Sequence, residues 1–526
     1  MATRIPPPKR QKIYFKHDKN RPPTPPPAEP APNVIVQFLS EQSGETPIGD
    51  VINVPSDFSR DALELLANKQ ANEEDDPIPY QFHVRLPDSA MDPNNAGAPT
   101  QLVITHSIFE DILSHPKKYF SSEDIIKVYC TPQAVFRVRP ATRCSSTLSG
   151  HGAAILCASF SPTGKLLATG SGDNNVRLWD LDTELPSHTL SGHRGWVLCV
   201  EWEARGRKLA SGGYDSEVRL WNPNTGKPLG NALKGHTKWV TSLAWEPIHI
   251  NPTNPRLASS SKDATVRVWN TANRTLHYTL GGHTASVNVV RWGGAGQGKS
   301  GVLYTASSDR TVRIWDADVG KLLFVLKDHA HWVTTLTLNT DFVLRTGPYD
   351  HLAKEPSSDA EAQELALKRY NALASTTSEL LISGSDDHTL FFWSPFGRNQ
   401  TGDSVKPITR LTGHQRQVNH VAFSPDGCWA ASASWDSSIR MWDGRTGKYV
   451  AALRGHVAPV YRLAWSADSR LLVSASKDST VKIWNLRTYK LHTDLPGHTD
   501  EVYCVDFVAD KIVSGGRDKK VKIWKN

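Results

Sequence analysis

Several residue types and patterns are scarce in this chain of 526 residues. The six cysteines show no Cys-x-x-Cys or Cys/His spacing of the kind that binds zinc. We therefore expect neither a zinc site nor a disulfide framework, and a reducing, intracellular environment. No apolar run approaches the ~20 residues that a membrane helix needs, and the first residues lack the apolar segment of a secretory signal. We expect no contact with a membrane.

Motifs of catalysis and nucleotide binding are missing as well. The chain contains no Gly-x-x-x-x-Gly-Lys-Ser/Thr loop and no His-Glu-x-x-His helix. A glycine-rich stretch, residues 293–298, falls inside a repeat and not between a strand and a helix, so we predict an ordinary loop. We expect no enzyme activity, no small-molecule substrate and no cofactor of the chain's own.

Charge is distributed unevenly along the chain, whose net formal charge is +7. Residues 1–32 carry a net charge of +5, residues 33–132 one of −10, and residues 133–526 one of +12. Regions of such different charge indicate different partners, and nucleic acid is one candidate for the basic regions.

Residues 1–32 hold ten of the 34 prolines and few apolar side chains, which predicts a disordered, proline-rich basic tail. The basic cluster of residues 9–12 is compatible with a nuclear-import signal, with a nucleic-acid contact, or with a simple solubilising tail.

Residues 33–132 are predicted to form a compact α/β domain. Apolar alternation, a serine helix cap and turn residues give the order strand, strand, helix, strand, strand, short helix, strand. This order is typical of the ubiquitin-like β-grasp fold. The predicted elements are residues 34–39, 51–54, 59–69, 80–86, 102–105, 108–113 and 125–129.

An internal repeat dominates the rest of the chain. Eight units each contain a His, then a Ser or Thr four residues before an Asp, then a Trp six residues after that Asp. The histidines recur every 42–47 residues apart from one longer interval, a period typical of WD40 repeats. We predict that each quartet is a structural chain of hydrogen bonds and no catalytic triad. Three of these tetrads are His151, Thr169, Asp173 and Trp179; His193, Ser211, Asp215 and Trp221; and His414, Ser432, Asp436 and Trp442.

The fold prediction is therefore mainly β: an eight-bladed WD40 β-propeller over residues 133–526, preceded by the ubiquitin-like domain. The last repeat stops after its third strand, and residues 142–149 occupy a fourth-strand position without a blade of their own. They are expected to close the ring, which removes open sheet edges. The long interval between His329 and Asp387 predicts a helical insertion at about 340–378 in the fifth blade.

Loop positions next to the tetrads should reach the narrow end of the propeller. Aromatic residues stand there beside Lys and Arg, a combination typical of interface hot spots and also suited to stacking on nucleotides. Core packing of the tryptophans and plain solvation of the charges are the alternatives. These candidates are Trp196, Tyr214, Trp239, Lys262, Trp332, Trp435, Lys477 and Arg517.

Glu123 and Asp124 enter the last predicted strand of the acidic domain as surface carboxylates would. A single carboxylate can complete the shell of a hard cation such as Mg²⁺ that another protein mainly holds. A solvated turn is the alternative.

The combination resembles the Notchless family, known in fungi as ribosome assembly protein 4. The resemblance covers residues 33–526 and rests on the domain order, the eight repeats and the helical insertion. It also rests on the link Tyr-Cys-Thr-Pro-Gln-Ala-Val-Phe-Arg-Val-Arg-Pro at 129–140 and on the segments 239–249 and 328–333.

The resemblance implies a non-enzymatic assembly factor for the large ribosomal subunit, located in the nucleus and nucleolus. The propeller would dock on the pre-ribosomal particle, against assembly factors, ribosomal proteins or rRNA. The metal-ion-dependent adhesion site of midasin, an AAA ATPase, would bind the ubiquitin-like domain. Glu123 would complete the Mg²⁺ site shared with midasin, with Asp124 and Glu110 as the next candidates. A WD40 signalling or ubiquitin-pathway adaptor is the alternative.

Overall fold

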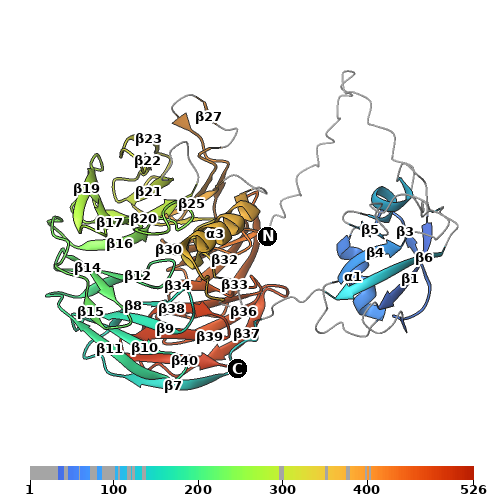
Figure 1. Cartoon of the computed structure of the whole chain (residues 1–526), viewed down its shortest axis with the longest axis horizontal. Coiled ribbons are helices and arrows are strands. Elements are labelled where there is room, and N and C mark those ends of the chain that lie inside the picture. Colours follow the sequence, from blue (N-terminus) through green and yellow to red (C-terminus); the bar gives the residue numbers. More distant parts are fainter. Residues whose placement is uncertain are drawn as a thin grey trace, which may run out of the picture. The chain divides into compact units, whose positions relative to one another are not determined.

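A computed structural model describes residues 33–40, 46–58, 60–70, 80–85, 101–104, 107–114, 120, 125–132, 138–294, 301–349, 354–374, 379–396, 400–401 and 404–526. The chain divides into two compact units, residues 1–135 and 136–526 (Figure 1). The predicted tail at 1–32 lies outside the described residues. None of the helices described is long and apolar enough to span a membrane.

The N-terminal unit is a mixed sheet with the strand order β2-β1-β6-β4-β5, in which β3 also pairs with β1. The first and last strands, β1 and β6, run parallel at its centre, and the other pairs are antiparallel. Its elements are β1 (Asn33–Ser40), β2 (Thr46–Pro47), β3 (Ile52–Pro55), α1 (Arg60–Gln70), β4 (Tyr80–Arg85), β5 (Gln101–Ile104), the π-helical turn η2 (Phe109–Leu113) and β6 (Ile125–Pro132).

Side-chain alternation explains the core of this unit. Successive side chains of a strand point to opposite faces, and Val34, Val36 and Phe38 of β1 are completely buried on one of them. Leu63 and Ala67 of α1, four residues apart on one side of the helix, join the same core. The helix therefore covers this face of the sheet.

The described residues of the C-terminal unit form eight four-stranded antiparallel sheets, which we call the blades. Their first strands contact one another around a ring and are called inner strands below. Blades one to four are β8 (Ile155–Phe160), β9 (Leu166–Ser171), β10 (Asn175–Asp180), β11 (Leu185–Ser191); β12 (Val197–Trp202), β13 (Leu209–Gly213), β14 (Val218–Asn222), β15 (Lys227–Pro228); β16 (Val240–Trp245), β17 (Leu257–Ser261), β18 (Val266–Asn270), β19 (Thr275–Leu280); and β20 (Val287–Gly293), β21 (Val302–Ser307), β22 (Val312–Asp316), β23 (Leu322–Leu326). Blades five to eight are β24 (Val333–Leu338), β25 (Leu381–Ser385), β26 (Leu390–Trp393), β29 (Thr409–Leu411); β30 (Val418–Phe423), β31 (Trp429–Ser434), β32 (Ser438–Asp443), β33 (Tyr449–Arg454); β34 (Val460–Trp465), β35 (Leu471–Ser476), β36 (Val481–Asn485), β37 (Lys490–Leu495); and β38 (Val502–Val508), β39 (Lys511–Gly516), β40 (Lys520–Lys525), β7 (Arg143–Ser149). A two-stranded ribbon, β27 (Gln400–Thr401) and β28 (Ser404–Val405), extends from blade five.

The eighth blade joins the two ends of the propeller. Its first three strands come from the end of the chain, and its fourth is β7, which pairs antiparallel with β40 (Figure 1). Leu148 of β7 lies opposite Val521, and both are buried. A backbone hydrogen bond of 2.9 Å from the Thr142 N–H to the Lys525 carbonyl extends the ladder. The ring is therefore closed by strand pairing.

An insertion with two helices, α2 (Asp341–Thr346) and α3 (Asp359–Ala374), connects β24 to β25. The Ser358 hydroxyl accepts a hydrogen bond from the Glu361 N–H at the start of α3, as a helix N-cap does. Ala362 and Ala366 of α3 then pack against Ala204 and Ile248. These partners follow the inner strands of blades two and three, so the insertion reaches far beyond its own blade.

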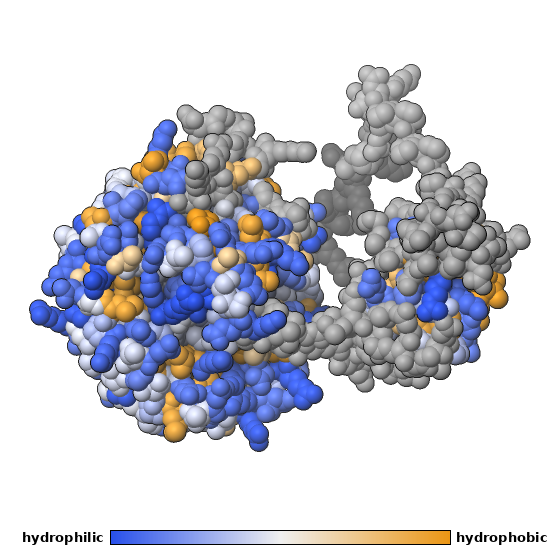
Figure 2. All heavy atoms as spheres, in the orientation of Figure 1, coloured by the Kyte–Doolittle hydropathy of each residue, from blue (hydrophilic) through white to orange (hydrophobic). Residues whose placement is uncertain are grey.

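The face of the propeller that Figure 2 shows is mostly hydrophilic, with small and separate apolar patches. The interior explains its stability, because every blade buries a tetrad Trp at its third strand.

Candidate interaction site

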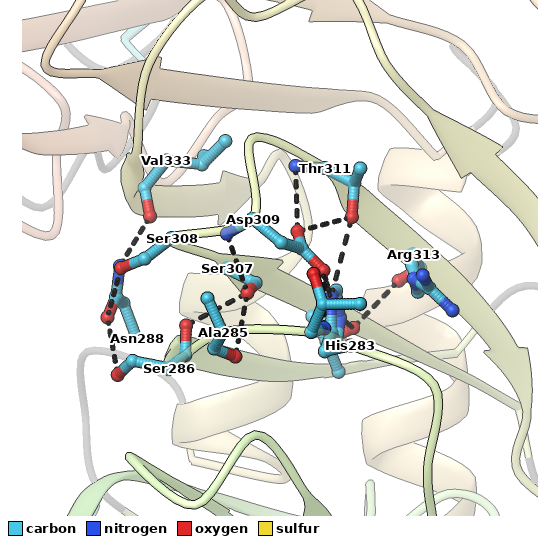
Figure 3. A network of polar contacts seen from close by, with 12 residues as sticks. His283, Ala285, Ser286, Asn288, Ser307, Ser308, Asp309, Thr311, Arg313 and Val333 are labelled. Carbon is cyan, nitrogen blue, oxygen red and sulfur yellow. Dashed lines mark hydrogen bonds and ion pairs between the residues drawn. The ribbon is translucent and has the colours of Figure 1, made fainter.

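The fourth blade illustrates how the tetrad residues are held (Figure 3). Nδ1 of His283 lies 2.7 Å from the Asp309 carboxylate, and its Nε2 lies 2.8 Å from the Thr305 hydroxyl. That hydroxyl accepts a hydrogen bond of 2.9 Å from the Trp315 indole N–H. Asp309 also accepts a hydrogen bond from the hydroxyl of Thr311. One chain of polar contacts thus joins two loops and two strands of the blade.

The same chain of contacts is present in all eight blades. The His–Asp distances are 2.7–3.1 Å, the His–Ser/Thr distances 2.7–2.9 Å and the indole–hydroxyl distances 2.7–2.9 Å. All eight Ser and Thr residues are fully buried. A hydroxyl without access to solvent or substrate cannot act as a nucleophile, so the tetrads hold the loops in place.

Protonation of the tetrads follows from burial and hydrogen bonding. Burial lowers the pKa of His414 although Asp436 opposes the shift. Burial raises the pKa of Asp436, but hydrogen bonds from His414, the Ser438 hydroxyl and the Gln415 N–H outweigh it, so its pKa is lowered overall. The carboxylate is therefore ionised at neutral pH, and the imidazole is neutral and can donate to it.

We expect Asp436→Ala to lower the free energy of unfolding of the propeller by about 1–3 kcal/mol, because buried donors lose their acceptor. Thermal and chemical denaturation measure the effect. Asp510→Ala, which changes an exposed aspartate of a turn, should leave the melting temperature unchanged. Equal melting of Asp436→Ala and wild type would contradict the assigned role.

The loops that carry the tetrad His and Asp residues lie together at one end of the blades. We call this end the tetrad face. It consists of the loops that precede the inner strands and the turns between the second and third strands. The turns between first and second strands, including the insertion, form the opposite face, which we call the insertion face.

Four of the predicted residues form one continuous cluster on the tetrad face. The rings of Trp196 and Tyr214 lie 6.1 Å apart, Tyr214 stacks on Trp239 at 4.2 Å, and the Lys262 ammonium lies 4.0 Å above the Trp239 ring. Trp196 is 57% exposed and Tyr214 is 45% exposed. We call this cluster the aromatic ladder. It crosses from blade two to blade three and places a cation against an aromatic face.

Backbone hydrogen bonds fix the ladder. The Tyr214 N–H donates to the Trp196 carbonyl at 2.8 Å, and the Lys262 N–H donates to the Trp239 carbonyl at 3.0 Å. The same blade therefore positions both members of each pair, and the surface is organised before any partner binds.

A second cluster lies at blades six to eight and includes three other predicted residues. The ring of Trp435 lies 6.2 Å from that of Tyr461, which in turn lies 5.7 Å from that of Tyr503. The Tyr461 hydroxyl donates to Glu501, and Lys477 is ion-paired with the same carboxylate at 3.6 Å. We call these residues, with the nearby Arg517, the tyrosine cluster.

Ion pairs reduce the positive charge of this second cluster. Lys477 pairs with Glu501, and Arg517 lies 3.7 Å from the Asp500 carboxylate. The aromatic ladder has its cation on a ring, so it is the more basic of the two surfaces. Trp332 is 53% exposed and lies beside His331, with the ring centroids 5.2 Å apart. It belongs to neither cluster.

The sequence prediction missed Tyr461, Tyr503 and Glu501. The two tyrosines occupy the second position of an inner strand, where the other blades have Leu, Thr or Asn. This substitution of aromatic side chains at one repeat position was the available signal. That these two tyrosines lie at the mouth of the ring follows only from the closed propeller.

Of the predicted metal ligands in the N-terminal unit, only one lies among the residues that the structure describes. Glu123 and Asp124 lie outside the described residues, and Glu110 lies in η2. Within the parts of the chain that the structure describes, no group of three or more His, Cys, Asp or Glu residues could hold a metal ion.

Comparison with family models gives two matches. The model "WD domain, G-beta repeat" matches residues 142–180, 185–222, 226–270, 274–316, 405–443, 447–485 and 489–525. The model "NLE (NUC135) domain" matches residues 34–89. Seven segments match the repeat model, and the interrupted fifth blade supplies the eighth sheet.

Two curated relatives extend over most of the chain. "Ribosome assembly protein 4" of Saccharomyces cerevisiae is 47% identical over 457 residues, which is 85% of each chain. "Protein Notchless" of Drosophila melanogaster is 45% identical over 404 residues, or 76% of each chain. The chain belongs to the Notchless family. The resemblance inferred from its sequence is thereby confirmed.

A solved structure supports the fold of this Notchless-family chain. The crystal structure of the computationally designed Ika8 protein matches with a TM-score of 0.56 and 23% identity. The match covers 74% of this chain and all of Ika8. It bears on fold alone and agrees with the mainly β, WD40-propeller prediction, which is confirmed.

Proposed function

We propose that this Notchless-family chain is a non-enzymatic assembly factor of the large ribosomal subunit that docks on the nuclear pre-ribosome through its tetrad face. The aromatic ladder carries the proposal, because it is an exposed and rigidly held surface of aromatic rings with a cation. Such surfaces concentrate binding energy. The name of the Saccharomyces cerevisiae relative, "Ribosome assembly protein 4", supports ribosome assembly as the process.

The charge of the chain supports the kind of partner. Residues 133–526 have a net charge of +12, which favours a ribonucleoprotein surface rich in phosphate. Pre-ribosomal assembly factors, ribosomal proteins and rRNA are the proposed partners. Location in the nucleus and nucleolus follows from the place where such particles form.

The test is co-sedimentation of the full chain with pre-ribosomal particles. We expect a Trp196→Ala and Tyr214→Ala double variant to move from particle fractions to light fractions, with an affinity at least about tenfold lower. Tyr449→Ala is the matched control, because Tyr449 is 52% exposed but lies on β33, away from the ladder. Normal sedimentation of the double variant would contradict docking by the ladder. A wild-type chain confined to light fractions would favour the adaptor function.

We further propose that midasin's adhesion site binds the N-terminal unit and that Glu123 completes its Mg²⁺ shell. The net charge of −10 over residues 33–132 suits a receptor centred on a metal ion. A carboxylate supplies the oxygen donor that Mg²⁺ prefers. Asp124 and Glu110 are the alternative donors. ATP-driven remodelling of the particle would then act through this connection.

We expect Glu123→Ala to abolish binding of the full chain to midasin's adhesion domain, because it removes the ligand. Glu123→Gln loses the charge and Glu123→Asp withdraws the carboxylate, so both should bind much more weakly. EDTA should mimic the loss, and Asp50→Ala, a change at an exposed acidic residue of the same unit, should bind normally. Binding that ignores EDTA, or a Glu123→Ala chain that binds like wild type, would contradict the assignment. Calorimetry measures all of these.

A further inference from the structure

The inner strands of the propeller enclose a central channel. It contains a cavity of about 440 Å³, lined by residues of all eight inner strands and by α2. A cavity of this size is within the range of binding pockets for small ligands and short peptide segments.

Helix α2 closes the channel at the insertion face. Arg345 of α2 forms hydrogen bonds of 3.2 and 3.3 Å to both carboxylate oxygens of Asp506 on β38. Asp341, at the other end of α2, accepts from the Thr337 hydroxyl and lies 3.5 Å from Nε of Arg291. The helix thus extends from blade five across to blade eight, and charge pairs hold both of its ends.

The channel remains accessible from the tetrad face. Every loop of that face is among the described residues, and none of these loops contributes to the cavity lining. The second positions of β34 and β38, which are Tyr461 and Tyr503 of the tyrosine cluster, lie next to this entrance. A ligand can therefore enter the cavity from the tetrad face, and two of the eight residues around that entrance are tyrosines.

Arg462 is the unusual side chain of this pocket. It is exposed although it lines the cavity, and it has no hydrogen bond or ion pair to any of the described residues. The equivalent inner-strand positions of the other blades hold Cys157, Cys199, Ser242, Val289, Thr335, His420 and Cys504, none of them acidic. Arg462 is therefore a cation without a counter-ion in its own layer.

The other charged groups of the pocket are deeper and largely engaged. Arg345 pairs with Asp506, and Arg291 lies beside Asp341. Glu201 lies in the layer next to α2, where Arg291, Arg345 and, more weakly, Arg462 act on it as cations, and burial raises its pKa. Both residues are among those described, and Glu201 makes no ion pair with Arg462. Burial and the neighbouring Arg462 lower the pKa of His420, so this ring adds no charge at neutral pH.

We propose that the central channel binds an acidic segment of a partner polypeptide, which enters from the tetrad face and places one carboxylate on Arg462. A guanidinium binds a carboxylate through two parallel hydrogen bonds. The hydroxyl side chain of Ser242 in the wall is available to a peptide backbone, whereas that of Thr241 donates to the Val287 carbonyl. A polynucleotide needs a series of cations, and of the three arginines in this pocket only Arg462 has no ion pair with the described residues. The proposal does not depend on docking by the aromatic ladder.

Fluorescence anisotropy with labelled acetyl-Gly-Ser-Glu-Tyr-Glu-Ser-Gly-amide tests the proposal on the full chain. We expect the wild type to bind this peptide at least about tenfold more tightly than the analogue with Gln in place of both Glu residues. Arg462→Gln should abolish this preference and Arg462→Lys should retain part of it. Arg454→Gln, which changes an exposed arginine at the end of β33, is the control and should retain all of it. Melting curves of each variant establish that it is folded.

Four results would overturn the proposal. These are no binding of the acidic peptide at millimolar concentration, equal binding of the Gln analogue, and an unchanged preference in Arg462→Gln. The fourth is displacement of the peptide by polyuridylate or inorganic phosphate but not by acetate, which would assign the site to phosphate groups.

Discussion

A chain that lacks residues 142–149 should fail to give a stable, monomeric propeller. The deletion removes β7, so β40 becomes an open edge of blade eight, with backbone donors and acceptors along Lys520–Lys525 unpaired. The buried Leu148 also disappears from the core that contains Val521 and Ile523. Lost hydrogen bonds and lost apolar burial together should lower the free energy of unfolding by on the order of 5 kcal/mol.

Analytical ultracentrifugation and thermal denaturation measure this effect, because open sheet edges favour association between chains. Leu148→Asp is a milder test of the same contact and should lower the melting temperature without removing the strand. Deletion of the tail at 1–32 serves as the length control. If the chain without 142–149 stayed monomeric and melted like wild type, closure by β7 would not stabilise the ring.

Glu379→Ala is expected to be the most damaging single substitution among the contacts of the insertion. Glu379 is 3% exposed and accepts hydrogen bonds from the hydroxyls of Tyr304 and Thr340 and from the Gly294 N–H, at 2.8, 2.8 and 3.1 Å. Burial raises the pKa of Tyr304 well above its usual value, so its hydroxyl remains a donor. Removing the carboxylate leaves up to three donors unsatisfied, at roughly 1–3 kcal/mol each.

Because contacts that share one carboxylate are not additive, we expect Glu379→Ala to lower the free energy of unfolding by about 3–6 kcal/mol, less than the full sum for three donors. Hydrogen exchange should also show faster opening of α2 and α3, because Thr340 and Glu379 stand at the two ends of the insertion. Glu379→Gln keeps an acceptor oxygen and should recover a large part of the stability. Equal stability of the Ala variant and wild type, or equal loss in both variants, would contradict this role of the carboxylate.

Much of the fold could be predicted from the sequence, because the repeat gives the same structural information several times. Eight copies of the same spacing identify the blades even where one is interrupted, and a buried tetrad requires its four residue types at fixed separations. The membership of the aromatic ladder was also predictable, since Trp196 and Trp239 occupy one repeated loop position and Tyr214 and Lys262 occupy another. The stacking of Tyr214 on Trp239 could not be predicted. The two rings belong to neighbouring blades, and their contact depends on the angle between these blades.

The path of the insertion could not be predicted for a similar reason. The long interval in the fifth blade indicated a helical insertion at about 340–378, and α3 spans Asp359–Ala374 within it. Its partners, however, are an alanine and an isoleucine of blades two and three, more than a hundred residues earlier in the chain. Closure of the channel by Arg345 and Asp506 likewise joins residues 161 positions apart. No local pattern encodes such distant contacts.

The pairing of β7 with β40 also constrains how the protein is made. Lys522 contacts Thr147 from 375 positions away, so β7 leaves the ribosome long before its partner strand exists. At the usual rate of about 5–20 residues per second, the wait lasts roughly 20–75 seconds. Throughout that time seven blades can form while the eighth has only its outermost strand. The nascent chain therefore carries an unpaired strand through most of its synthesis, and a chaperone that shields this segment during translation would protect it from pairing with other chains.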